Sequence, residues 1–152
     1  MVMGALGLPW ALEAQTPPAA WFGTWTLNLA KSTYDPGPGP YRRSTFTMEP
    51  SEDGVKVTYD MVGVRGGLTH LEWTGPFDGR DYAVQGVEEF ITYAYIRVDD
   101  RTCDVLTKVD GTIVATSRVV LSPDGRSMTT VTSGNGAQGR KITSATVYEK
   151  QD

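Results

Sequence analysis

Apolar and polar residues alternate along most of this chain, in short segments separated by turn-forming residues. A period of two places every second side chain on the same face of a β-strand. Ten such segments are predicted as strands: 21–29, 41–48, 55–61, 68–74, 82–85, 90–98, 103–109, 112–121, 127–132 and 141–149. Asp-Gly pairs, which accept the positive φ angles of tight hairpins, occur four times, as at Asp53-Gly54 and Asp110-Gly111. The pattern predicts an all-β protein with antiparallel neighbours.

The short connections between these segments favour an up-and-down order of strands. Segment 32–40 is rich in proline and glycine, and we expect it to be an exposed connection because proline has no N–H to donate. A meander of this length avoids free edges by closing on itself. The expected fold is an antiparallel up-and-down meander that closes into a barrel of about ten strands.

The same periodicity predicts which side chains face the interior. One face of the third strand carries Val55, Val57, Tyr59 and Met61, and one face of the eighth carries Ile113, Ala115, Ser117, Val119 and Leu121. Segment 90–98 has two apolar faces, one with Ile91, Tyr93, Tyr95 and Arg97, the other with Thr92, Ala94, Ile96 and Val98. Either of these two faces can line the interior.

The length of 152 residues corresponds to about one domain, which is large enough for a hydrophobic core. The net charge is −4 and the 14 basic residues form no long run, so nucleic acid is not an expected partner.

Cys103 is the single cysteine, which excludes an internal disulfide and a multi-cysteine metal site. We expect this thiol to be a buried apolar group, and we expect no metal and no cofactor.

Residues 1–20 differ in composition from the remainder, which forms the predicted barrel domain 21–150. Residues 1–12 are almost wholly apolar, and no lysine or arginine precedes Lys31. Pro9 and Glu13 interrupt this segment, which is too short to span a bilayer. It is either the remnant of an export signal or an apolar arm of the mature chain. The first alternative predicts a secreted or periplasmic protein, and the second a homo-oligomer held together by the arm.

The two ends of the predicted barrel carry a family resemblance. The stretch Trp21-Phe22-Gly23-Thr24-Trp25-Thr26-Leu27 resembles the opening of the calycin barrels, the lipocalins and intracellular fatty-acid-binding proteins. The closing Ala145-Thr146-Val147-Tyr148-Glu149-Lys150 resembles the last strand of a fatty-acid-binding barrel. The resemblance implies a Gly-x-Trp that plugs one end of the barrel and a ligand in its interior. The chain from 21 to 150 also resembles uncharacterised exported bacterial barrels with this opening.

Two departures from the fatty-acid-binding pattern concern the ligand. Segment 31–40 stands where that family has a pair of lid helices, and Thr146 stands where it commonly has an arginine two residues before a tyrosine. Tyr148 matches that tyrosine. The resemblance therefore does not imply an arginine in the last strand that would bind the carboxylate of a ligand.

His70 is the only histidine, and Glu72 lies on the same face of its predicted strand. A histidine oriented by a carboxylate is suited to proton abstraction. Alternatively, His70 and Glu72 belong to the solvent face of a strand whose buried face carries Leu71 and Trp73. An enzyme of the isomerase or cyclase type, using His70 or a tyrosine, is one hypothesis.

Aromatic residues in the predicted strands favour a different hypothesis, a small hydrophobic or amphipathic ligand bound inside the barrel. The candidate ligand-binding residues are Trp25, Tyr59, Trp73, Tyr93, Tyr95, Arg97 and Tyr148. An aromatic cavity with a few polar groups is a common binding arrangement, and Arg97 would pair with an anionic end of the ligand. Tyrosine is also favoured in strands for its β propensity, which is the alternative explanation of the same pattern. A third hypothesis is a structural subunit that assembles through the N-terminal arm.

Overall fold

The protein is described by a computed structural model that covers residues 16–135 and 139–152. A short 3-10 helix, η1 (Ala19–Trp21), precedes ten strands. The strands are β1 (Gly23–Asp35), β2 (Tyr41–Ser51), β3 (Gly54–Gly63), β4 (Leu68–Gly75), β5 (Tyr82–Gln85), β6 (Ile91–Asp99), β7 (Thr102–Val109), β8 (Thr112–Leu121), β9 (Ser127–Asn135) and β10 (Lys141–Lys150). The proposed N-terminal arm lies largely outside the described residues.

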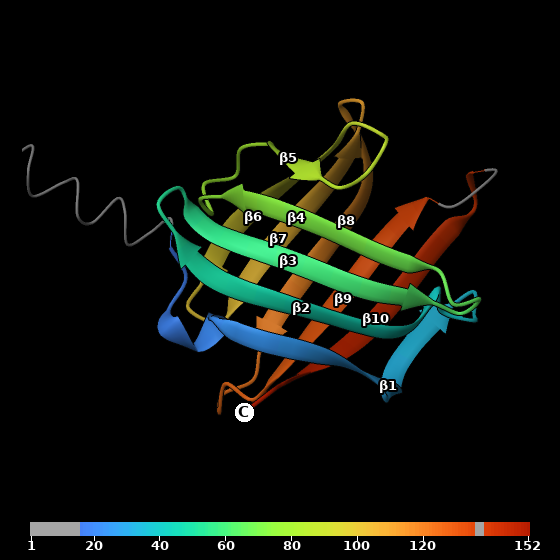
Figure 1. Ribbon diagram of the computed structural model, residues 1–152, viewed down its shortest axis with the longest axis horizontal. Helices are drawn as coiled ribbons and strands as arrows, with labels where there is room; N and C mark the ends of the chain where they lie inside the picture. The colour runs from blue at the N-terminus through green and yellow to red at the C-terminus, as the bar shows by residue number, and fades with distance from the viewer. Residues whose placement is uncertain (1–15, 136–138) are drawn as a thin grey trace, which may run out of the picture.

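The ten strands form a closed antiparallel barrel (Figure 1). Each strand pairs with its neighbour in sequence, and β1 pairs with β10 to complete the circle. The predicted all-β, up-and-down barrel of ten strands is confirmed. In the part of the chain that the structure describes, no helix has the length and apolar character needed to cross a membrane.

The predicted Asp-Gly turns join neighbouring strands. Val109 pairs with Thr112, so the hairpin between β7 and β8 has the two-residue loop Asp110-Gly111. Asp110 has φ of 49° and Gly111 has φ of 82°, as a type I′ turn requires. At Gly54, the first residue of β3, φ is 122° and an added Cβ would lie 2.6 Å from the Pro76 Cα. A side chain at that position would collide with the backbone at the start of the connection between β4 and β5.

Segment 32–40 is only in part the exposed connection that its composition predicts. β1 continues to Asp35, with Thr33 opposite Ala145 and Asp35 opposite Thr143. The register shifts between Asn28 and Thr33, where β1 bulges away from β10. The prolines begin only at Pro36, so residues 33–35 keep the N–H groups that the ladder needs. This extension lengthens the wall of the barrel on the β1–β10 side.

Strand periodicity identifies the inner faces correctly, with one exception. Val55 and Val57 are fully buried. In β6, where periodicity did not decide between two apolar faces, the face with Ile91, Tyr93 and Tyr95 lines the interior. The exception is Ile113, which is 49% exposed. A register shift between Thr107 and Lys108 of β7 changes the pairing at this end of β8. The alternation of inward and outward side chains that runs from Leu121 to Ala115 is therefore interrupted before Ile113.

Two buried tryptophans, Trp21 and Trp25, close one end of the barrel. Trp21 in η1 donates its indole N–H to the Asp100 carbonyl oxygen at 2.8 Å, and Trp25 donates to the Trp21 carbonyl oxygen at 3.1 Å. Lys150 donates to the Ala20 carbonyl oxygen at 2.7 Å and lies 5.1 Å from the centroid of the Trp25 ring. These bonds fix η1 across the end of the barrel. We refer to this end as the closed end.

Candidate functional site

A cavity of about 500 Å³ occupies the barrel above its closed end. Trp21, Met48 and Met128 line its bottom and are buried. Toward the opposite end the lining residues are partly exposed, and Pro40 there is exposed to solvent. The volume lies within the range of about 300–1,000 Å³ that is typical of small-molecule sites. The interior of this barrel is therefore a candidate binding site that is open at one end only.

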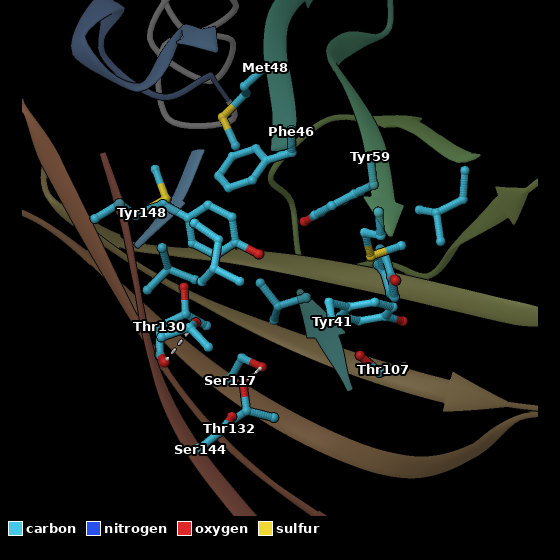
Figure 2. Close-up of a pocket in the computed structure, with 18 of the residues that line it drawn as sticks. Tyr41, Phe46, Met48, Tyr59, Thr107, Ser117, Thr130, Thr132, Ser144 and Tyr148 are labelled. Atoms are coloured by element: carbon cyan, nitrogen blue, oxygen red, sulfur yellow. Dashed lines mark hydrogen bonds between the residues drawn. The ribbon is translucent and has the colours of Figure 1, made fainter. Parts of the chain in front are cut away.

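Aromatic and aliphatic side chains from β2, β3, β4 and β6 form one wall of the cavity. Phe46 is central to it, with its ring centroid 5.3 Å from that of Tyr59 and 4.9 Å from that of Tyr148 (Figure 2). Tyr59 and Tyr95 bring their hydroxyl oxygens within 3.4 Å of each other. We refer to Phe46, Met61, Tyr59, Leu71, Ile91, Tyr93 and Tyr95 as the aromatic wall.

On the other side, β7, β8, β9 and β10 contribute small hydroxyl side chains, which we call the hydroxyl wall, and β7 to β9 also contribute the apolar Cys103, Val105, Val119 and Met128. The members of the hydroxyl wall are Thr107, Ser117, Thr130, Thr132, Ser144 and Thr146. In the circular strand order β8 and β9 lie opposite β3 and β4, so the two walls face each other across the cavity. Figure 2 shows the hydroxyl groups of Ser117, Thr130 and Thr132 gathered on the side away from Phe46.

The hydroxyl wall is only partly satisfied by hydrogen bonds within the protein. Ser117 and Thr132 share a bond of 2.8 Å, and Thr146 donates to the Thr130 carbonyl oxygen at 3.4 Å. The side-chain hydroxyls of Thr107, Thr130 and Ser144 have no partner within the described part of the chain. Since they border the cavity, they remain available to a molecule inside it.

None of the described residues that line the cavity carries a formal charge at neutral pH. Burial raises the pKa of Tyr59 well above its ordinary value of 10.0 and that of Tyr93 to about 12. Burial also raises the pKa of Tyr95 and of Tyr148. The Cys103 thiol, whose pKa burial raises to about 12, is likewise neutral, in agreement with its prediction as a buried apolar group. The cavity therefore offers neutral hydroxyl donors and acceptors to a ligand.

The sequence-predicted binding residues separate into two groups. Tyr59, Tyr93, Tyr95 and Tyr148 line the cavity. The side chains of Trp25 and Trp73 are buried and lie outside the lining. Trp73 donates its indole N–H to the carbonyl oxygens of Tyr82 at 3.1 Å and Tyr93 at 3.2 Å. The two tryptophans therefore support the cavity without bordering it.

Arg97, the predicted partner for an anionic ligand, is also outside the cavity lining. Its guanidinium donates to the Thr16 carbonyl oxygen at 3.0 Å and to Asp100 Oδ1 at 2.6 Å. Although Arg97 follows Tyr93 and Tyr95 in the alternation of β6, it comes near the strand's end, beside the turn to β7. In this position the guanidinium ties the segment before η1 to that turn.

His70 and Glu72 lie on the outer surface of β4. The His70 side chain is 55% exposed, with Nδ1 at 2.6 Å from Asp60 Oδ1 and Nε2 at 3.2 Å from Glu72 Oε2. These two hydrogen bonds raise the pKa of His70. Neither His70 nor Glu72 lines the cavity. These positions support the alternative interpretation of the sequence, in which His70 and Glu72 belong to the solvent face of the strand.

Sequence reasoning missed most of the hydroxyl wall. The signal was present as serine or threonine at every second position, Thr130 and Thr132 in β9 and Ser144 and Thr146 in β10. Such positions usually indicate the solvent face of a sheet. Only the closure of the barrel around a hollow shows that this face is the inner one.

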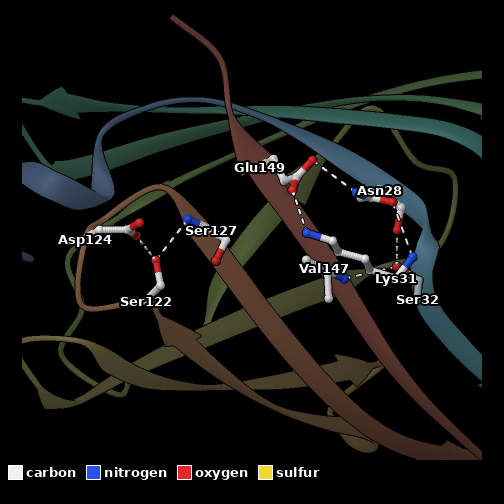
Figure 3. A network of polar contacts seen from close by, with 8 residues as sticks. All are labelled: Asn28, Lys31, Ser32, Ser122, Asp124, Ser127, Val147 and Glu149. Carbon is white, nitrogen blue, oxygen red and sulfur yellow. Dashed lines mark hydrogen bonds and ion pairs between the residues drawn. The ribbon is translucent and has the colours of Figure 1, made fainter.

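The seam between β1 and β10 closes the wall beside this cavity (Figure 3). At the bulge in β1, the Ser32 hydroxyl donates to the Asn28 carbonyl oxygen at 2.7 Å and accepts from the Val147 amide at 3.0 Å. Asn28 and Lys31 both contact the Glu149 carboxylate, at 3.0 and 3.3 Å. Side chains thus replace the ladder bonds that the bulge interrupts.

The chain matches no protein-family model, and comparison with curated proteins and with solved structures finds no match either. The described residues contain no group of three or more histidine, cysteine, aspartate or glutamate side chains placed to hold a metal ion.

Proposed function

We propose that this protein is a calycin-like barrel that binds a small hydrophobic or amphipathic molecule in its interior. The observation that carries the proposal is the cavity of about 500 Å³, closed at one end and bordered by the aromatic wall. Burying apolar ligand surface there contributes about 25 cal/mol per Å² before the costs of association. Side chains alone leave this space open, so a ligand can occupy it without displacing the core.

The experiment is a fluorescence titration with phenylnaphthylamine, a neutral dye that emits strongly only in apolar surroundings. The informative variant is Thr130→Phe, which adds a ring at a position that lines the cavity. Its matched control is Val131→Phe, because the adjacent Val131 is 55% exposed. We expect one dye per chain, and we expect Thr130→Phe to weaken binding on the order of tenfold, or about 1.4 kcal/mol.

Equal affinities of the two variants, or no binding by the unchanged protein, would overturn the proposal. Native mass spectrometry of gently purified full-length protein provides an independent measurement. It reports a co-purified molecule, the number of subunits and the mass of the mature chain. The number of subunits tests whether the protein forms a homo-oligomer.

We further propose that the protein is exported, to the periplasm or outside the cell. The support is the apolar composition of residues 1–12 and the resemblance to exported bacterial barrels. Leu12-Glu13-Ala14 before Gln15 resembles a signal-peptidase site, so export through a cleaved signal predicts a mature chain that starts close to Gln15. Determining the N-terminal residue of the protein in its source cell tests this. A mature chain that retains residues 1–14 would contradict cleavage and favour the arm as a part of the protein.

A further inference from the structure

Accepting the proposed function as the premise, we infer that the ligand is uncharged in its buried part and has two unlike sides. One side is a flat apolar surface that packs on the aromatic wall. The other is an edge with hydroxyl or carbonyl oxygens that bonds the hydroxyl wall. The ligand class is therefore a neutral, ring-containing, oxygenated molecule rather than a fatty acid or another organic ion.

The absence of charge follows from the cavity lining. An ion loses its hydration when it enters an apolar cavity, and it needs an opposite charge to compensate. No described lining residue supplies one. Arg97, which the sequence suggested as a partner for an anionic ligand, donates its guanidinium hydrogen bonds to Thr16 and Asp100 instead. The carboxylate of a buried acid would therefore have only neutral hydroxyls as partners.

The two unlike sides follow from the arrangement of the walls. Phe46 of β2 and Tyr59 of β3 line the cavity from paired positions on neighbouring strands, with their ring centroids 5.3 Å apart, so both rings lie on one side of it. Across from them, Thr107, Thr130 and Ser144 hold hydroxyl groups that have no hydrogen-bond partner among the described residues. A purely hydrocarbon ligand would cover these hydroxyls without replacing their bonds to water, at a cost in affinity. A ligand with an apolar ring and oxygens along one edge can pack on the aromatic wall and hydrogen-bond to the hydroxyl wall.

Three related dyes separate these properties. Phenylnaphthylamine is neutral and has no carbonyl group, anilinonaphthalene sulfonate is the same molecule with an added sulfonate, and prodan is a neutral naphthalene with a ketone. Each is titrated by fluorescence into the full-length protein and into the triple variant Thr107→Val, Thr130→Val, Ser144→Ala. Thr130→Val alone is the second variant, should the triple variant fail to fold. Thr116→Val, at an exposed position of β8, is the control.

We expect phenylnaphthylamine to bind about tenfold or more tightly than its sulfonate. We expect the triple variant to lose about threefold to tenfold in affinity for prodan, with phenylnaphthylamine changed by less than about twofold. Sulfonate binding within about threefold of the neutral dye, in competition with it, would overturn the absence of charge. Unchanged prodan affinity in both hydroxyl-wall variants would overturn the hydrogen-bonding edge. If none of the three dyes binds, the proposed function itself fails.

Discussion

The Ser32 hydroxyl lies 3.0 Å from the Val147 amide nitrogen, 115 positions away in sequence, and accepts its hydrogen bond. The same hydroxyl donates to the Asn28 carbonyl oxygen at 2.7 Å. One side chain thus satisfies two backbone groups where β1 bulges from β10. The first and last strands therefore stay joined along the length of the barrel, although their ladder is interrupted.

Ser32→Ala is expected to lower the free energy of unfolding by about 1–3 kcal/mol, because the partly buried Val147 amide loses its acceptor. Denaturant unfolding followed by tryptophan fluorescence measures the change. Ser133→Ala is the control, since the Ser133 side chain has no hydrogen bond within the described residues, and it should stay within about 0.5 kcal/mol of the unchanged protein. Similar values for both variants would show that the seam does not depend on Ser32.

Trp25 is the second test of the architecture, because its side chain is fully buried at the closed end. Trp25→Ala is expected to cost about 3–5 kcal/mol in unfolding free energy, through lost apolar contacts and the hole left behind. Leu68→Ala serves as the control, since Leu68 is 82% exposed and its removal should cost little. Thermal or denaturant unfolding of both variants gives the comparison. A small loss for Trp25→Ala would contradict its role in closing the barrel.

The surface cluster of His70, Asp60 and Glu72 predicts that the stability of the folded protein depends on pH. Both imidazole nitrogens face carboxylate oxygens, of Asp60 and Glu72, so the doubly protonated ring satisfies both contacts. These bonds raise the pKa of His70 above its ordinary value of 6.5. The resulting stabilisation is fully present below the unfolded-state pKa and is lost as the pH rises through the folded-state pKa.

NMR titration of the imidazole should give a midpoint above 6.5, and Asp60→Asn should lower that midpoint because it removes the main cause of the shift. The stability of the unchanged protein relative to His70→Gln should decline with rising pH over the same window. Ligand binding should not follow this titration, since His70 lies outside the cavity lining. A midpoint at or below the ordinary value would contradict the cluster geometry.

The cavity tyrosines predict a late alkaline titration. Burial raises the pKa of Tyr93 to about 12 and raises that of Tyr59 well above 10.0. Ultraviolet absorbance of tyrosinate should therefore increase at higher pH in the folded protein than after unfolding in guanidinium, where it increases near pH 10. Tyr59→Phe should reduce the part of the increase that comes at the highest pH. Because the folded state retains these protons, stability should fall as the pH rises above about 10.

Much of this fold follows from local sequence. Alternation and turn chemistry are short-range properties, so Asp110-Gly111 and the inner face of Val55 and Val57 are correctly predicted. The bulge before Thr33 is different. The bond between Ser32 and Val147 bridges it, and because these residues are far apart in sequence, no local pattern in β1 predicts this bulge. The register shift that exposes Ile113 lies within the β7–β8 hairpin, but the alternation of apolar residues does not show where a bulge interrupts the pairing.

The candidate site was predictable only in part for a similar reason. Periodicity identifies Tyr59 and Tyr148 as inward residues, but it does not specify how far along the barrel axis each side chain lies. Trp25 and Arg97 belong to faces that look suitable for binding, yet both are placed outside the cavity lining. Thr130 and Thr132 have the composition of a solvent face and instead border the interior. Axial position is a property of the closed barrel, set by register around all ten strands.

The most direct test of the internal binding site uses the methionine methyl groups as reporters. Of the five methionines, Met48, Met61 and Met128 line the cavity, and Met1 and Met3 lie outside the described residues. In a carbon–proton NMR spectrum of methyl-labelled protein, adding phenylnaphthylamine should shift all three cavity methyl signals, because an aromatic ring would lie against them. Tight dye binding that leaves the signals of Met48, Met61 and Met128 unchanged would place the ligand outside the barrel and contradict the account.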